Sequence, residues 1–152
     1  MKNGEKAPLR RDDMDNDPIR QFIIWLQEAE QAGISQPNAM TLATSNGQNK
    51  PSARMVLLRG INERGFVFFT HYESRKGQDL RENPVAALVF FWPSLSRQVR
   101  VEGSVELLEA SESDLYFANR PRGHQIEAYA SPQSRVVEDR LFLEKRFNDM
   151  AR

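Results

Sequence analysis

Apolar residues near the start of the chain recur at the spacing of a helix that buries one face. Asp17 followed by Pro18 is typical of a helix start, because aspartate caps free backbone N–H groups and proline is tolerated in the first turn. Gly33 is a typical helix end, since glycine readily adopts the left-handed conformation found there. The pattern therefore predicts a helix between them, with a buried face formed by Ile19, Phe22, Ile23, Leu26 and Ala29.

From position 39 the apolar pattern changes to short runs of strand length. Asn46-Gly47 is a strong hairpin signal, and a second turn is expected at residues 62–65. The run at 85–92 is apolar throughout, which predicts a strand buried on both faces. Residues 97–107 instead alternate apolar and charged positions, as a half-buried strand does. The predicted strands are 39–44, 52–59, 66–70, 85–92 and 97–107.

Four further helices are expected, three of them after the last strand. In this prediction Ser74 caps the first and Pro84 stops it, while Ser111 and Asp114 form a capping-box-like pair in the second. The predicted ranges are 74–83, 109–120, 123–130 and 136–150. One helix, five antiparallel strands and then helices predict a mainly β fold, because such meanders usually close toward a barrel that removes free strand edges.

Composition excludes several classes of protein. The 152 residues suit one domain, expected at residues 17–152 after a polar, mobile arm at residues 1–16. The 21 basic residues balance 21 acidic ones, which argues against general binding of nucleic acids or membrane surfaces. Without cysteine there is no disulfide or thiolate chemistry, and with two histidines a metal site is not expected. No secretion signal or membrane-length apolar run is visible, so a cytoplasmic location is expected.

Cations stand at the ends of predicted strands and at a predicted helix start. Arg54 and Arg59 flank an apolar run and are five positions apart on one predicted strand. We therefore expect them on opposite faces, one of them toward a pocket or a partner. Ser74-Arg75-Lys76 combines a hydroxyl, two cations and free backbone N–H groups, which can form an anion site. Taken alone such a motif is more often a solvated helix end, and Arg54 and Arg59 shift the balance toward an anion site.

A second candidate anion site lies at residues 116–124. Tyr116 and Arg120 are four positions apart on a predicted helix, hence on the same face. A phenol and a guanidinium so placed can hold a phosphate, although a stacked pair on the surface is the alternative. His124 is either a third donor or a loop residue.

Two further polar positions suit a planar ligand. Gln98, and the pair Gln133-Ser134 in a predicted turn, can hydrogen-bond a heterocycle or simply face solvent. Met55 and the aromatic cluster at 90–92 are interpreted as core or subunit interface. The chain has no glycine-rich phosphate loop, nucleophile elbow or paired-carboxylate signature. These features together favour binding of a flat, phosphorylated ligand by scattered strand ends.

The joint pattern resembles the pyridoxine/pyridoxamine 5′-phosphate oxidase family. The resemblance runs from about Leu9 to the last residue with the family's spacing, and it is specific only as a whole. The matching segments are R-M-V-L-L-R at 54–59, F-F-T at 68–70, S-R-K at 74–76, N-P at 83–84, R-Q-V at 97–99, Y-F-A-N-R-P-R-G at 116–123 and S-P-Q-S at 131–134.

This resemblance implies an FMN-binding split β-barrel that forms a homodimer with two flavin sites at the subunit interface. It implies oxidation of pyridoxamine or pyridoxine 5′-phosphate to pyridoxal 5′-phosphate in vitamin B6 metabolism, with hydride passing to the flavin and O₂ reduced to H₂O₂. In such an enzyme the flavin carries the redox chemistry and the protein supplies orientation and electrostatics, so no catalytic side chain is assigned.

Carried over by position, the resemblance also implies the contact residues. Arg75 and Lys76 would bind the FMN phosphate. The whole FMN set would be Arg54, Met55, Val56, Leu57, Leu58, Arg59, Phe69, Thr70, Arg75, Lys76, Gln98, Gln133 and Ser134. The substrate phosphate would be held by Arg59, Tyr116, Arg120 and His124.

The sequence departs from the family pattern at several places. Arg59 stands where lysine is usual, His124 where serine is usual, and Phe69 where tyrosine is frequent. Family members continue beyond the position of Arg152 with W-x-G and R-x-H-x-R segments, and the N-terminal arm here is short. Three hypotheses stay open: an FMN-dependent oxidase, a flavin-binding family member without turnover, and a barrel module for another phosphorylated ligand.

Overall fold

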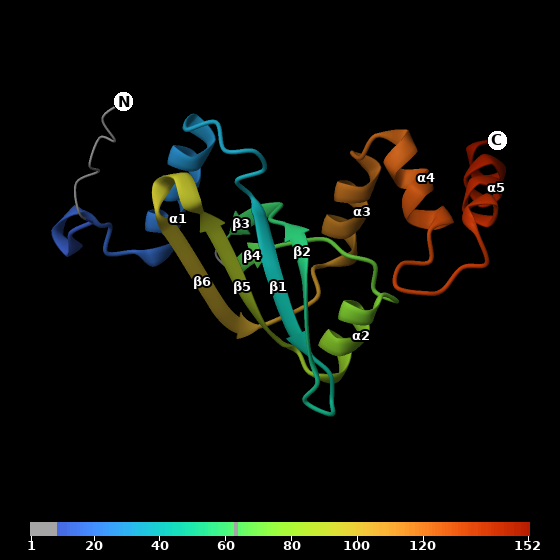
Figure 1. Ribbon diagram of the computed structural model, residues 1–152, viewed down its shortest axis with the longest axis horizontal. Helices are drawn as coiled ribbons and strands as arrows, with labels where there is room; N and C mark the ends of the chain where they lie inside the picture. Colours follow the sequence, from blue (N-terminus) through green and yellow to red (C-terminus); the bar gives the residue numbers. More distant parts are fainter. Residues whose placement is uncertain (1–8, 63) are drawn as a thin grey trace.

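Two antiparallel sheets form the centre of the fold. The structure, a computed structural model, describes residues 9–62 and 64–152. In that part of the chain a four-stranded sheet has the order β2-β1-β5-β6, and β3 pairs with β4 in a second sheet (Figure 1). The strands are β1 (Ala39–Ser45), β2 (Pro51–Leu57), β3 (Gly60–Asn62), β4 (Gly65–Val67), β5 (Val85–Trp92) and β6 (Arg97–Ser104).

Helices lie around the sheets, with α1 at one side of the molecule and α3, α4 and α5 grouped at the other (Figure 1). Within the described ranges, no helix combines the length and apolarity that crossing a membrane requires. The helices are α1 (Pro18–Gln31), α2 (Arg75–Glu82), α3 (Ala110–Ala118), α4 (Arg122–Ala130) and α5 (Arg140–Ala151), with 3-10 turns at Arg11–Asp13 and Pro93–Leu95.

The first helix confirms its predicted start and end, but the predicted buried face is wrong at Ile23, which is exposed, while Phe22 and Ala29 are buried. The Asp17 carboxylate accepts hydrogen bonds from the backbone N–H groups of Ile19 (2.8 Å) and Arg20 (3.4 Å), which satisfies donors that the first helical turn leaves free. The buried face of α1 then packs against both sheets, since the Phe22 ring lies 4.9 Å from Phe66 and 4.7 Å from Phe90. This helix therefore joins the two sheets into one core.

Alternation along the strands separates an inner from an outer face of the large sheet. Met40, Leu42 and Thr44 of β1 are buried on the inner face, together with Phe90 and Trp92 of β5. The core comprises Phe22, Ala29, Met40, Leu42, Leu58, Leu88, Phe90 and Trp92. Because cross-strand partners share a face, Arg54, opposite Leu42, also belongs to the inner face.

The prediction that residues 85–92 are buried on both faces is wrong for this chain. Phe91 is 63% exposed and Val85 is also exposed, because they lie on the outer face, which no element within residues 9–62 and 64–152 covers at these positions. Met55 of β2 lies on the same face and is 63% exposed. The run at 85–92 is therefore apolar on both faces, but in one chain only its inner face is buried.

Four boundaries differ from their predictions. The strand expected at 52–59 ends at Leu57, and the described chain has six strands rather than five, because Gly60 begins the separate β3–β4 hairpin. The helix expected at 109–120 ends at Ala118. Its first residue follows Glu109 and no side chain caps it, so the predicted Ser111–Asp114 capping box is wrong. The last helix starts at Arg140, where Asp139 caps it, rather than at 136.

Two further strands end earlier than predicted: the strand expected at 66–70 ends at Val67, and the one expected at 97–107 ends at Ser104. The other elements follow their predictions closely. The hairpin turn between β1 and β2 is present, with the Asn46 carboxamide oxygen accepting from the backbone N–H groups of Gln48 and Lys50. Helix α4 is confirmed within one residue. Residues 1–8 of the predicted mobile arm lie outside the described part of the chain, and the expectation of a mobile arm stays a prediction.

Candidate functional site

The N-terminus of α2 is built as predicted, and tightly. Ser74 is fully buried, and its hydroxyl donates to the carbonyl of His71 at 2.6 Å while accepting from the backbone N–H of Gly77 at 3.4 Å. A Cβ at Gly77 would stand 2.1 Å from the Tyr72 carbonyl oxygen, so only glycine lets the preceding turn fold this closely onto the helix. The turn and the cap together fix the backbone positions of Arg75 and Lys76.

Lys76 is the buried cation of this helix start. Its side chain is 8% exposed, and its ammonium donates to Ser74 Oγ at 3.2 Å and to Gln133 Oε1 at 2.8 Å. Burial, and next the nearby Arg54 guanidinium, lower the pKa of Lys76 below the ordinary value for lysine. Two candidate residues 57 positions apart are thereby joined, since Gln133 lies in the segment between α4 and α5.

Arg54 lies on the inner face of β2, beside the same helix. Its guanidinium donates to the Leu42 carbonyl (3.2 Å), to Thr44 Oγ1 (2.7 Å) and to Ser52 Oγ (2.7 Å). The Asp79 carboxylate of α2 lies 3.6 Å from its Nη2 atom. Burial lowers the pKa of Arg54, Asp79 opposes that change, and Arg75 adds to it through repulsion. Arg54, Arg75 and Lys76 therefore form one group of neighbouring cations.

Thr70 supplies a further donor near the start of this turn. Its hydroxyl oxygen is buried and has no hydrogen-bond partner within residues 9–62 and 64–152. Buried hydroxyls are nearly always paired, so an unpaired one indicates a missing ligand atom or water. Cations, hydroxyls and free N–H groups are the donors that a phosphate monoester needs, so these residues fit the cofactor that the family resemblance implies.

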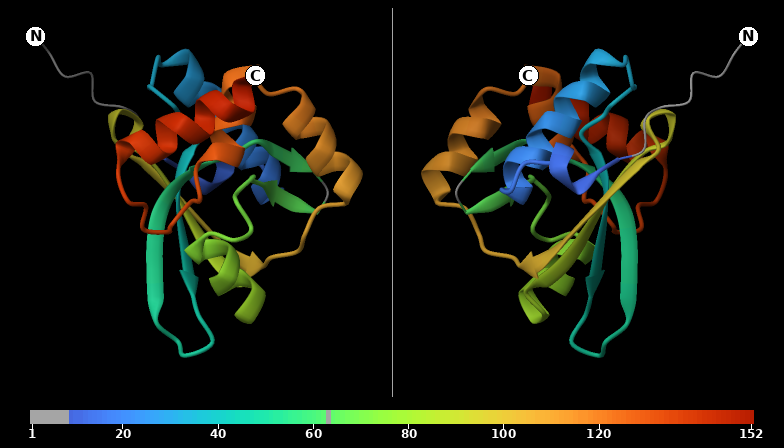
Figure 2. Two further views of the ribbon diagram at one scale, coloured as in Figure 1. Left: turned by 90° about the vertical axis from the view of Figure 1, so that its right-hand side faces the viewer. Right: turned by 90° about the vertical axis from the view of Figure 1, so that its left-hand side faces the viewer.

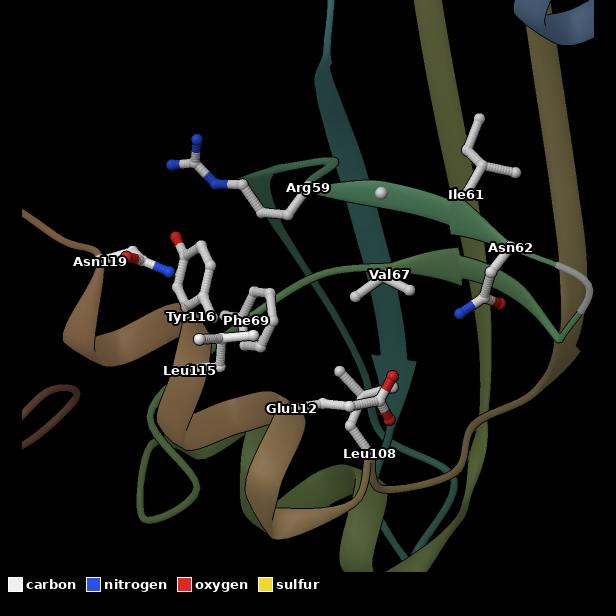
Figure 3. A pocket seen from close by; sticks show the side chains of 11 residues that line it. Arg59, Ile61, Asn62, Val67, Phe69, Leu108, Glu112, Leu115, Tyr116 and Asn119 are labelled. Carbon is white, nitrogen blue, oxygen red and sulfur yellow. The ribbon is translucent and has the colours of Figure 1, made fainter.

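A pocket of about 380 Å³ lies between the β3–β4 hairpin and α3 (Figure 3). Arg59, predicted for cofactor and substrate, and Tyr116, predicted for substrate, both line it. The Tyr116 ring stacks on Phe69 with a centroid separation of 3.6 Å, which brings a predicted cofactor residue to the same wall. Figure 3 shows the Arg59 guanidinium and the Tyr116 hydroxyl at one end of the pocket and Glu112 at the other.

Arg59 reaches this pocket because the strand ends before it. Its backbone N–H donates to the Val67 carbonyl at 2.8 Å, so the residue belongs to the connection with the second sheet. Arg54 and Arg59 were expected on opposite faces of one strand. That reason is wrong, because β2 ends at Leu57 and Arg59 lies outside it. The two arginines still point to different places, one to the cation group and one to the pocket.

Arg120 and His124 are not brought to the pocket. Arg120 follows the end of α3, and its guanidinium lies over the Phe117 ring at 5.9 Å, so it does not share a helix face with Tyr116 as predicted. The stacked aromatic–arginine pair was the alternative, but its aromatic partner is Phe117. His124 is exposed in the first turn of α4 and is not among the residues that line the pocket.

Gln98 lies far from the cation group. It stands opposite Phe91 on the outer face of the sheet, whereas Arg54 lies on the inner face. It is also near the end of β5, about 20 Å along the strand from the end that follows α2. Figures 1 and 2 show α2 at the end of the sheet where β1 ends. One chain therefore does not assemble the whole predicted cofactor set.

The other predicted cofactor residues surround these groups. Leu58 is buried in the core and its backbone pairs with Asn38, while Val56 and Leu57 are half-buried in β2. Ser134 is exposed with a φ of 67°, a left-handed conformation that places a non-glycine residue in a tight turn.

Sequence reasoning missed several polar residues at these sites. Asp79 is buried beside Arg54, and Thr44 donates to it at 2.7 Å. Glu112 at the pocket pairs with Arg64 of the hairpin at 2.7 Å and raises its pKa. Asn119 also lines the pocket. A polar residue among apolar ones in β1 was a signal for Thr44, but nothing local distinguishes Asp79 from a solvated helical carboxylate.

Comparison with known sequences gives a consistent result. A profile of the family described as "Pyridoxamine 5′-phosphate oxidase" matches residues 26–151. The chain is similar to proteins named pyridoxine/pyridoxamine 5′-phosphate oxidase from Salinibacter ruber (58% identity, 94% of this chain, 66% of the relative) and Paraburkholderia phytofirmans (51%, 99% and 70%). It thus spans about two thirds of the length of these relatives.

Solved structures place the fold in the same group. PhzG from Burkholderia lata, determined with tetrahydrophenazine-1-carboxylic acid, superposes with a TM-score of 0.90 at 31% identity, over 97% of this chain and 74% of that one. A pyridoxamine 5′-phosphate oxidase-related, FMN-binding protein from Nostoc punctiforme gives 0.65 at 20% identity, over 84% and 70%. The predicted fold, a mainly β split barrel with flanking helices, is confirmed by this likeness.

Proposed function

Because the chain belongs to the pyridoxamine 5′-phosphate oxidase family, we propose that it is an FMN-dependent oxidase acting on pyridoxamine or pyridoxine 5′-phosphate. The product is pyridoxal 5′-phosphate and the electron acceptor is O₂. The observation that carries the proposal is the contact between Lys76 and Gln133, which joins two predicted cofactor residues from distant segments. The buried, unpaired hydroxyl of Thr70, another predicted cofactor residue, supports it.

The proposed cofactor site is centred on the start of α2. Arg75 and Lys76 bind the FMN phosphate, with Arg54 behind them and Thr70 as an added donor. When bound, FMN supplies the two-electron oxidation of the substrate and the transfer of those electrons to O₂. The protein's contribution is to hold the phosphate in place and to orient the ring system.

The proposed substrate site is the pocket beside α3. Arg59 and Tyr116 bind the substrate phosphate, since a guanidinium and a phenol at one end of an otherwise largely apolar pocket suit a phosphorylated ring. Arg120 and His124, also expected there from the family resemblance, would have to move from the positions described above. Arginine at position 59 keeps the cation that the family's lysine supplies.

A homodimer completes the proposed cofactor site. Gln98 lies on the outer sheet face with Met55 and Phe91, away from Lys76 of the same chain. Docking of a second copy on this exposed apolar face would cover it and would bring a partner's Gln98 toward the flavin. This arrangement uses every predicted cofactor residue, which one chain does not.

A second candidate is a flavin-binding member of the family without oxidase turnover. The matched region is 66–70% of the length of the relatives, so about a third of each has no counterpart in the 152 residues. Positioning groups supplied by such a segment can contribute orders of magnitude in rate. PhzG also shows that the same fold occurs with a tricyclic carboxylic acid in place of a vitamer.

One experiment separates these candidates. The purified protein is reconstituted with FMN, its visible spectrum is recorded, and pyridoxamine 5′-phosphate is added under air. We expect a bound flavin, formation of the aldehyde and an equivalent amount of H₂O₂. A bound flavin without aldehyde leaves the second candidate, and a protein that does not bind FMN contradicts both.

The substrate site is tested with Tyr116→Phe, which keeps the ring on Phe69 and removes the hydroxyl. Loss of a hydrogen bond to a charged phosphate costs about 1.5–3 kcal/mol, so we expect KM to rise about tenfold or more with a smaller change in kcat. Tyr129→Phe is the matched control, because Tyr129 is exposed and packs on Phe117 outside the pocket. An unchanged KM in Tyr116→Phe would remove Tyr116 from the site.

A further inference from the structure

Asp79 is a buried carboxylate that the proposed function does not use. It is 5% exposed in the middle of α2, and its Oδ2 atom accepts from Thr44 Oγ1 at 2.7 Å and lies 3.6 Å from Arg54 Nη2. Burying a carboxylate is costly unless it is paired, so its place here needs a reason. Its surroundings supply one, because it lies beside Arg54, one of the three cations assigned to the cofactor phosphate.

Arg54 does not depend on Asp79 for its orientation. Three other acceptors hold the guanidinium: the Leu42 carbonyl, Thr44 Oγ1 and Ser52 Oγ, at 2.7–3.2 Å. Asp79 adds charge at a longer distance and fixes the proton of the Thr44 hydroxyl. An asparagine could still accept from Thr44, so the charge can be removed while these contacts are kept.

The charges around Asp79 do not balance. Burial is the main cause of the lowered pKa values of Arg54 and Lys76, and repulsion adds to it, from Arg75 on Arg54 and from Arg54 on Lys76. Asp79 is the acidic group that acts on Arg54 in the opposite direction. The neighbouring Glu73 pairs with Arg81 at 3.0 Å and is exposed. Asp79 thus offsets the charge of Arg54, and the charges of Arg75 and Lys76 remain, which favours an anion that balances them.

We propose that Asp79 is an internal counter-ion of the phosphate-binding cations, stabilising them when no ligand is bound and weakening the hold on the cofactor phosphate. This inference rests on the proposed function, since it takes Arg54, Arg75 and Lys76 as the phosphate site. Without ligand, the carboxylate reduces the repulsion among the cations and so stabilises the folded protein. It also keeps the phosphate affinity below the maximum that the three cations allow. A purely structural role, tying α2 to β1, makes a different prediction.

The test compares FMN with riboflavin, which lacks the phosphate. In Asp79→Asn we expect a lower melting temperature without ligand and a higher ratio of FMN to riboflavin affinity, by roughly three- to tenfold at low salt. A structural role lowers stability and weakens both flavins equally. Glu82→Gln is the matched control, because Glu82 is on the same helix, accepts from Gly47 N–H at 2.8 Å and lies outside the cation group. An unchanged or reduced ratio in Asp79→Asn overturns the proposal.

Two further measurements apply if the wild-type protein binds no flavin or if the variant does not fold. If the wild-type protein binds no flavin, the proposed function fails, and inorganic phosphate becomes the probe: a larger thermal shift in Asp79→Asn than in wild type supports the counter-ion, and an equal or absent shift overturns it. If Asp79→Asn does not fold, the double variant with Lys76→Met decides. Removal of one cation restores folding if charge is the cause, and an unfolded double variant contradicts it.

Discussion

Lys76 is the residue at which burial and charge oppose each other most directly. Its ammonium is nearly enclosed, and burial together with Arg54 lowers its pKa. Between this lowered pKa and the ordinary value for lysine, the unfolded chain binds more protons than the folded one. Raising the pH through that range therefore increases the stability contribution of Lys76, while it removes the charge that binds an anion.

This opposition predicts a specific pH dependence of cofactor binding. As the pH rises toward the ordinary pKa of lysine, the affinity for FMN should fall relative to that for riboflavin, because only FMN has a phosphate for Lys76 to bind. Titrations of flavin fluorescence at several pH values measure the ratio. Lys76→Arg is the control, since arginine keeps its charge over this range and should flatten the profile. A decline of equal size in Lys76→Arg would exclude Lys76 as its origin.

At the scale of single residues, the sequence predicted candidate site residues better than it predicted the side chains that they contact. The motif at residues 74–76 predicted an anion site only together with Arg54 and Arg59, because a solvated helix end was the alternative for the motif alone. That Lys76 would be buried, and that Gln133 would accept from it, depended on a contact across 57 positions. Arg120 shows the converse: the helix predicted to end at residue 120 ends two residues earlier, at Ala118, and the Arg120 guanidinium lies over Phe117 rather than beside Tyr116.

Among the elements, α2 depends most on close backbone approach. The turn before it folds onto the helix so tightly that a Cβ at Gly77 would lie 2.1 Å from the Tyr72 carbonyl oxygen. Backbone atoms cannot yield as a flexible side chain does, so any larger residue must displace the turn that carries Ser74, Arg75 and Lys76. Stability and phosphate binding are therefore coupled through this glycine.

We expect Gly77→Ala to destabilise the protein by about 1–3 kcal/mol, the usual cost of overpacking, and to weaken FMN more than riboflavin. Urea unfolding and flavin titration measure the two effects. Gly123→Ala is the matched control, because this glycine is also helical and a Cβ there meets nothing within 4 Å. Alanine should leave that position neutral or stabilise it by up to about 1 kcal/mol. Equal effects of the two substitutions would contradict the role given to Gly77.

At the scale of the whole molecule, the outer face of the large sheet stands out as an exposed apolar surface. Rows of small and apolar side chains cross it, such as Ala53–Ala43–Ala87, and Met55 and Phe91 are each 63% exposed. Within one chain this face has no cover among the described elements. It also carries Gln98, so the proposed dimer would explain both the exposed apolar surface and the split cofactor set.

Light scattering should therefore give the mass of a dimer, and Phe91→Glu should shift it toward a monomer and weaken FMN binding at least tenfold, because a buried unpaired carboxylate is costly at an interface. Ile24→Glu is the control, since Ile24 is exposed on α1, two positions from the buried Phe22. A monomeric wild-type protein that still binds FMN tightly would contradict a cofactor site between subunits.

The sequence by itself determined the elements whose signals are local: the capped α1 and α2, the hairpin after β1 and the alternating β6. The anion site at residues 74–76 stays a prediction. The sequence also carried the family resemblance, since that depends on short motifs at fixed spacing. Only the tertiary structure decided that Asp79 is buried beside Arg54, that Gln133 contacts Lys76, and that Gln98 and Arg54 lie on opposite faces of one sheet. These facts follow from strand register and from packing between distant segments, which no local pattern specifies.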